Sequence, residues 1–329
     1  MIKNITIFVF LLSLSSLSLG DELEDRKEIS NNVKELLSHN SFSELESISI
    51  KYRNSQERTS SGLWKLTLFY AGFDEFYSHQ QNDEKAWLDS IKKMDLWISI
   101  YPRSPTPYIA KAILIEKRAW TIRGTGYAST VSPDAWKPFH EKITLSKRVL
   151  ESSKLISSKD PHWYASMANI ATIQSWEEIK LKKLLNEGFS KFPSYFQMYF
   201  NAMDYYTPKW RGDANKIESF ATEIVDKTKA KEGFGMYARI YWYASQSQFQ
   251  GQLFEKSNVR WDIMSQGIDD VLKKYPDQWN INNFALFSCL AQDKEKTREL
   301  ISMIKYPAIK TAWLEDLRIY EHCKIWSMR

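Results

Sequence analysis

The sequence predicts an all-α protein with the architecture of an irregular α-solenoid, in which helical hairpins stack in series. Apolar residues recur at helical spacing, as in Trp87, Ile91, Met94, Ile98 and Tyr101, which are four, three, four and three residues apart. No stretch alternates apolar and polar residues over the length that a half-buried strand requires. Glycine and proline are scarce, at 11 and 10 of 329 residues, which disfavours an all-β fold with many tight turns.

The helices are expected in order along the chain, each with an apolar stripe. They include residues 63–77, 83–101, 106–122, 133–150, 195–206, 236–244, 261–275, 284–290, 297–304 and 308–326. Three of the helix starts combine a capping residue with a proline, at Thr106, Ser132 and Asp160. Most of the 13 tryptophans, among them Trp87, Trp97 and Trp261, occupy stripe positions and are therefore expected in the core.

Three helices are predicted to end in an aromatic residue followed by proline, at Tyr101, Phe192 and Tyr275. Proline disfavours helix in the residue before it and lacks a backbone donor, which explains the stops. The separations of 91 and 83 residues each accommodate two hairpins of a degenerate repeat. We expect an N-terminal helical region over residues 21–80, continuous with a helical-repeat domain over residues 81–329.

The first twenty residues have the pattern of a secretory signal. Lys3 precedes an apolar segment over residues 5–14, and Ser18, Leu19 and Gly20 form a small-residue cleavage site. No later stretch is long and apolar enough to span a bilayer. The sequence therefore predicts a periplasmic or secreted protein without a transmembrane segment after cleavage.

Charge is distributed unevenly, although the net charge is only +5 and does not indicate nucleic-acid binding. Residues 103–160 contain eleven Lys and Arg against five Asp and Glu. This local excess has two explanations, a solvated helical face or a site for an anionic partner.

The segment from residue 118 to residue 136 interrupts the helical pattern and is the main candidate for a functional surface. Two glycines break the helix, since glycine readily adopts positive φ, and aromatic and arginine side chains crowd the break. Another helix break, near residue 210, has a similar composition. The predicted binding residues are Arg118, Trp120, Arg123, Gly124, Gly126, Tyr127, Trp136, Trp210 and Arg211. They either anchor the two breaks or face a groove, where tryptophan with arginine suits peptide or glycan recognition.

No catalytic or cofactor motif is found. The five histidines show neither the H-E-x-x-H pattern nor zinc-finger spacing, so no metal is expected. There is no nucleophile elbow and no phosphate-binding loop, and we expect neither a cofactor nor an enzyme. Cys289 and Cys323 are the two cysteines, and they are either bridged in a disulfide or are two buried thiols.

Five segments carry a resemblance to a known family. They are Gly62-Leu-Trp-Lys-Leu, Arg118-Ala-Trp-Thr-Ile-Arg-Gly-Thr-Gly-Tyr-Ala, Asp160-Pro-His-Trp-Tyr, Pro208-Lys-Trp-Arg-Gly and Tyr237-Ala-Arg-Ile-Tyr-Trp. In these segments the chain resembles a domain-of-unknown-function family of exported bacterial proteins with tetratricopeptide-like helices. The resemblance implies a helical fold and an envelope location, and it supplies no activity.

The sequence therefore favours a non-catalytic binding protein whose partner is a protein or peptide of the cell envelope. The alternative is a protein that binds or acts on envelope glycans, because tryptophan is abundant beside a basic segment. A third hypothesis is that the glycine loop has a purely structural role and only locks adjacent hairpins together.

Overall fold

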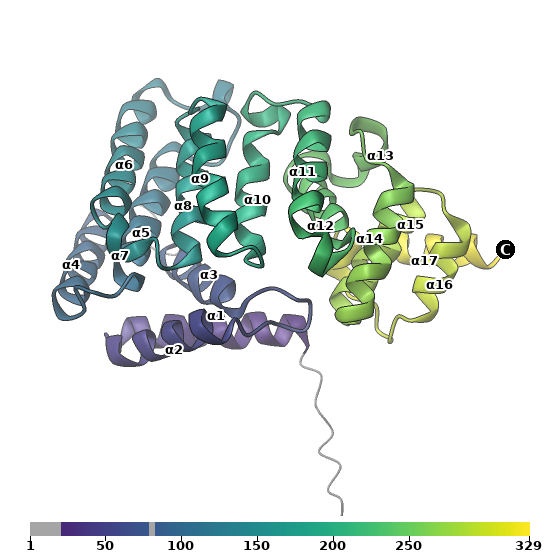
Figure 1. Ribbon diagram of the computed structural model, residues 1–329, viewed down its shortest axis with the longest axis horizontal. Helices are drawn as coiled ribbons and strands as arrows, with labels where there is room; N and C mark the ends of the chain where they lie inside the picture. Colours follow the sequence, from purple (N-terminus) through teal and green to yellow (C-terminus); the bar gives the residue numbers. More distant parts are fainter. Residues whose placement is uncertain (1–20, 79–82) are drawn as a thin grey trace, which may run out of the picture.

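The computed structural model describes residues 21–78 and 83–329 (Figure 1). The described residues are helical and contain no strand, since only an isolated bridge joins Arg58 to Trp64. This confirms the predicted all-α class. The expected signal (residues 1–20) and the expected boundary at residue 80 lie outside the described residues.

The α-helices follow the predicted order. They are α1 (Glu22–Ser38), α2 (Phe42–Ser55), α3 (Lys65–Ser78), α4 (Glu84–Ile100), α5 (Thr106–Arg123), α6 (Pro133–Ser152), α7 (Lys154–Ser157), α8 (Pro161–Ile173), α9 (Glu178–Lys191), α10 (Phe196–Tyr205), α11 (Ala214–Glu232), α12 (Gly235–Ala244), α13 (Leu253–Lys256), α14 (Trp261–Lys274), α15 (Gln278–Leu290), α16 (Lys294–Ser302) and α17 (Leu317–Met328). Short turns are η1 (Ala128–Thr130), η2 (Pro208–Trp210), the π-helical η3 (Ser245–Phe249), η4 (Gln250–Gln252) and η5 (Lys310–Trp313).

Most of these helices stand side by side in a curved row (Figure 1). Contacts join α4 to α5, α5 to α6, α6 to α8, α8 to α10, α10 to α12 and α12 to α14. Helix α15 follows, with contacts to α14, α16 and α17. Each helix thus buries its apolar stripe mainly on its neighbours in the row. The tetratricopeptide-like character of the repeat stays a prediction.

The first two helices lie across the row instead of extending it (Figure 1). Helix α1 packs on α3 and also contacts α15, near the other end of the chain. The loop after α2 also contacts distant parts of the chain. Arg58 in this loop donates to the Ser194 carbonyl, between α9 and α10, at 3.1 Å. Asn280 donates to the carbonyl of Ser61 at 3.2 Å. The N-terminal segment therefore ties the two halves of the row together.

The predicted stripes supply the core. Trp87 and Trp97 are 3% and 0% exposed, and Trp97 stacks on Phe42 with ring centroids 5.2 Å apart. Trp261 departs from the prediction, since it is only partly buried and its indole donates to Asp293 at 2.9 Å. It is the first residue of α14 and packs against the edge of the core instead of lying within it.

Two of the three predicted proline-associated caps are corrected. Asp160 caps α8 as expected, accepting a hydrogen bond from the His162 amide at 2.8 Å. Ser132 precedes α6 but makes no side-chain cap bond. Thr106 lies inside α5, and its hydroxyl accepts a hydrogen bond from Arg53 instead. The Thr106 hydroxyl, which the sequence pattern assigned to a helix cap, is therefore bonded to an arginine from another helix.

The C-terminal helices also differ from the prediction. Helix α15 begins at Gln278, six residues before the expected start, because Asp277 caps it. Residues 308–326 form η5 and α17 instead of one helix. Leu314 and Glu315 both have positive φ, 53° and 63°, which ends the first helical segment before Asp316 caps the second.

Candidate functional site

The glycine loop joins α5 to α6 through η1, at the position predicted from the sequence. Gly124 has φ 77° and ψ 167°, a conformation essentially restricted to glycine, and its amide closes α5 by donating to the Trp120 carbonyl at 2.7 Å. The residues from Gly124 to Thr130 are exposed. The chain thus leaves the helix sharply and presents the loop at the surface.

Arg123 organises this loop. Its guanidinium lies 5.2 Å from the ring centroid of Trp120, 4.8 Å from that of Trp136 and 5.7 Å from that of Phe139. The same group donates to the carbonyls of Gly124 and Gly126 at 2.9 and 3.1 Å. Burial lowers the pKa of Arg123. The arginine therefore holds the loop against an aromatic cluster by cation–π contact and by hydrogen bonds.

Residues from four segments converge on one open groove of about 750 Å³, which we call the aromatic groove. Six predicted site residues line it, namely Trp120, Arg123, Gly126, Tyr127, Trp136 and Trp210. Trp120 and Trp210 meet edge to face with centroids 6.4 Å apart, so the break near residue 210 adjoins the glycine loop. Tyr127 is 81% exposed and Trp136 is half-buried.

Several lining residues were missed by the sequence reasoning. Phe139 and His140 project from α6, and the His140 ring stacks on Trp136 at 5.8 Å. Gln248 and Gln250 come from η3 and η4 after α12, and Gln248 accepts a hydrogen bond from the Lys209 amide at 3.2 Å. Only the glutamine-rich composition of that stretch hinted at a surface element.

Arg118 does not belong to the aromatic groove. It forms an ion pair with Glu84 and lies 5.4 Å from the ring centroid of Trp87, so it faces α4. The five residues from Arg118 to Arg123 correspond to a rotation of about 140° around a helix, which puts the two arginines on different faces. Gly124 and Arg211 also lie outside the lining, and Arg211 is exposed with φ 78°.

The basic character of residues 103–160 is partly neutralised in space. Carboxylates from outside this stretch pair with its lysines and arginines. The pairs are Lys111–Asp95, Lys117–Asp74, Arg118–Glu84 and Lys154–Glu187. Tertiary contacts thus reduce the excess of positive charge that a count along residues 103–160 gives.

A second pocket of about 350 Å³ adjoins the groove, and Trp120 lines both. Burial and the nearby Asp74 carboxylate raise the pKa of Glu116 to about 7 in this pocket. His162 stacks on Tyr70 at 4.2 Å, its Nδ1 lies 2.7 Å from the Tyr195 hydroxyl, and burial lowers its pKa to about 4. At neutral pH the histidine is therefore uncharged and is suited to hydrogen bonding.

Within residues 21–78 and 83–329, no group of three His, Cys, Asp or Glu is arranged to hold a metal ion. No helix in the same ranges has the length and apolarity needed to cross a membrane. Cys289 and Cys323 are joined in a disulfide, with Cα atoms 5.9 Å apart, which links α15 to α17. This resolves the alternative that the sequence left open.

Comparison with known proteins provides no further guide to the site, because no family model, curated protein or solved structure matches the chain.

Proposed function

We propose that this protein is a non-catalytic helical-repeat protein of the periplasm or the secreted fraction that binds a protein or peptide in the aromatic groove. The observation that carries the proposal is the convergence of aromatic side chains from separate segments on one open groove of about 750 Å³. Half-buried tryptophans and an exposed tyrosine are the residue types that most often anchor binding partners.

The polar groups of the groove support a peptide as the ligand. Gln248 and Gln250 supply amide donors and acceptors from η3 and η4, and Lys209 adds a positive charge beside Trp210. An extended peptide needs both kinds of partner, apolar surface for its side chains and hydrogen-bonding groups for its backbone. Arg123 contributes mainly by holding the glycine loop in place, because its Nη1 already donates to two carbonyls.

The second candidate is an envelope glycan, favoured by the exposed ring of His140, which stacks on Trp136 at 5.8 Å in the groove. Sugars stack on aromatic faces as readily as peptide side chains do. The two candidates differ in what they bind, so one experiment with two probes separates them.

The test compares binding of the protein to a peptide array and to a peptidoglycan-fragment array. We expect peptide binding, with a loss of about tenfold in Tyr127→Ser, because one exposed aromatic anchor is removed. Tyr306→Ser is the matched control, since Tyr306 is 89% exposed and lies outside the groove. Equal binding by the two variants, or binding to glycan fragments alone, would contradict the proposal.

A further inference from the structure

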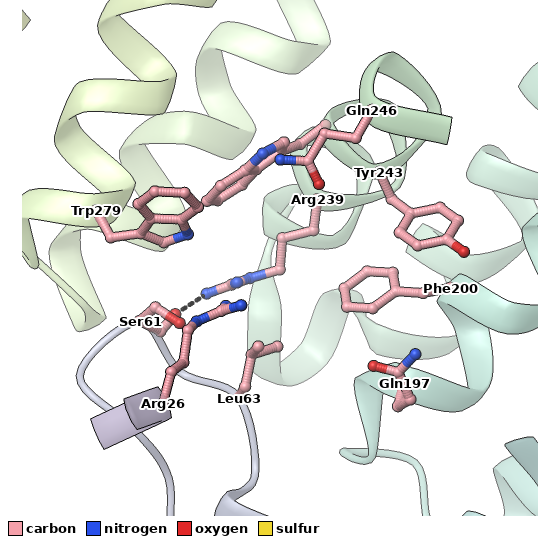
Figure 2. A pocket seen from close by; sticks show the side chains of 10 residues that line it. Arg26, Ser61, Leu63, Gln197, Phe200, Arg239, Tyr243, Gln246 and Trp279 are labelled. Carbon is pink, nitrogen blue, oxygen red and sulfur yellow. Dashed lines mark hydrogen bonds between the residues drawn. The ribbon is translucent and has the colours of Figure 1, made fainter. Parts of the chain in front are cut away.

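A smaller pocket of about 210 Å³ lies where the N-terminal segment meets α10, α12 and α15 (Figure 2). It adjoins the pocket that contains His162, since Gln197 lines both. We call it the arginine pocket, because Arg26 and Arg239 are its charged lining residues. Figure 2 shows both guanidinium groups pointing into the space beside the indole of Trp279.

Arg239 is buried, at 4% exposure, yet it forms no ion pair with any described carboxylate. It donates from Nη2 to the carbonyl of Ser61 at 2.5 Å, and its guanidinium lies 5.4 Å from the ring of Phe196 and 5.7 Å from that of Tyr275. A buried cation without a paired anion is unfavourable, so proteins seldom retain one without a partner. The arrangement thus leaves a positive charge available in the wall of a pocket.

The surrounding charges do not neutralise this arginine. Glu22 is fully buried, but its two oxygens already accept from Arg26 at 2.7 Å and from the Ser61 amide at 3.0 Å. Arg58 adds a third guanidinium, which lies 4.7 Å from the ring of Phe196, the ring that Arg239 also contacts. Three arginines thus gather in this region, and among the described residues Glu22 and Glu232 act on Arg239 electrostatically without forming an ion pair with it.

Neutral hydrogen-bond donors complete the lining. The indole Nε1 of Trp242 is buried and has no hydrogen-bond partner in the described part of the chain, although the ring is only 8% exposed. Buried donors are rarely left without an acceptor. Gln197 and Gln246 place side-chain amides at the same pocket, while Leu63 and Phe200 supply apolar wall (Figure 2).

We propose that the arginine pocket binds a carboxylate attached to an apolar or aromatic group, with Arg239 and Arg26 as its cationic partners and Trp242 as a neutral donor. Arginine recognises the planar carboxylate through paired N–H groups. The small volume and apolar walls favour a monoanion with an apolar substituent over strongly hydrated phosphate. The ligand is either a small carboxylic acid or the C-terminal end of a peptide, which share this chemistry.

Isothermal titration calorimetry on the full chain tests this site with four probes. They are N-acetyl-phenylalanine, its uncharged amide, phenylacetate and inorganic phosphate. We expect both carboxylates to bind, the amide to lose at least about tenfold, and phosphate to bind more weakly than either carboxylate. Tighter binding of N-acetyl-phenylalanine than of phenylacetate would identify a peptide end, and the reverse order would identify a small acid. Equal binding of the amide, or stronger binding of phosphate, would overturn the proposal.

Variants locate the site and keep the test decisive if one of them does not fold. Arg239→Gln and Arg26→Gln are each expected to weaken carboxylate binding about tenfold or more, and Trp242→Phe by less. Arg318→Gln is the matched control, because its side chain is 91% exposed and is not part of the pocket. Unchanged binding in both Arg26→Gln and Trp242→Phe would refute the site. The inference is independent of the proposed function, since Tyr127→Ser is expected to leave carboxylate binding unchanged.

Discussion

Arg53 donates from Nε to the carboxylate of Asp160 at 2.8 Å, although 107 residues separate them in the chain. The hydroxyl of Tyr70 donates to the same carboxylate oxygen at 2.8 Å, so α2, α3 and the start of α8 meet at one buried charge. Asp160 is fully buried, and its other oxygen caps α8. The pair therefore joins the transverse N-terminal helices to the row.

Asp160→Asn is expected to destabilise the protein by about 3–5 kcal/mol, because it leaves the Arg53 guanidinium buried beside an uncharged group. Asparagine still accepts the cap hydrogen bond, so the variant isolates the ion pair from the cap. Urea denaturation followed by far-UV circular dichroism measures the change. Asp89→Asn removes an exposed carboxylate from α4 and is expected to leave the midpoint unchanged. Similar midpoints for the two variants would show that the buried pair contributes little.

The Glu116 carboxyl predicts a pH dependence of stability. Burial, with help from Asp74, raises its pKa from 4.5 to about 7. The folded state therefore retains a proton that the unfolded state releases. The contribution of Glu116 to stability is most favourable below pH 4.5 and is lost as the pH rises through 7. Glu116→Gln is expected to be more stable than wild type at pH 8, by on the order of 1–3 kcal/mol, and similar at pH 4.

Chemical denaturation at a series of pH values tests this expectation. Glu141→Gln, which removes an exposed carboxyl of α6, serves as the control and is expected to follow the wild-type profile. A Glu116→Gln profile parallel to that of wild type would rule out Glu116 as the source of the dependence.

Two glycines are expected to differ in how well they tolerate alanine. A Cβ at Gly212 would lie 1.8 Å from the Tyr206 carbonyl oxygen, so the backbone has to move, and Gly212→Ala is expected to lose several kcal/mol of stability. A Cβ at Gly124 meets no atom within 4 Å, and only its positive φ opposes alanine, at about 1–3 kcal/mol. Thermal melting of the two variants orders them, and a lower melting temperature for Gly124→Ala would contradict this reading of the two turns.

The disulfide between Cys289 and Cys323 spans 34 residues of sequence and is expected to stabilise the C-terminal end of the row by about 3–4 kcal/mol. Wild-type protein should therefore unfold at lower urea concentration when a reductant is present. The double variant Cys289→Ala with Cys323→Ala should unfold at that lower concentration whether or not reductant is added. A wild-type midpoint that does not respond to full reduction would show that the bridge is dispensable.

The glycine loop illustrates how much of the candidate site was predictable from sequence. Gly124 and Gly126 interrupt an otherwise regular apolar period, and the aromatic residues beside them lie within a few turns of the break. The convergence of Trp210 on Trp120 could not be inferred, because it depends on how α8 packs against α5 and α6 on one side and against α10 on the other. The sequence was sufficient to exclude Arg118 from the aromatic groove, because helical geometry alone puts it on a different face from Arg123.

The sequence by itself determined the helical class, most helix positions and the cap at Asp160. Periodicity and capping depend on residues within about one turn of each other, which a linear sequence displays directly. The tertiary structure alone decided that Asp160 pairs with Arg53 and that Thr106 binds an arginine instead of capping a helix. It also decided that Arg239 is buried without a carboxylate partner among the described residues. The partners of a buried polar group come from segments that are distant in the chain, and only the packing of the helices brings them together.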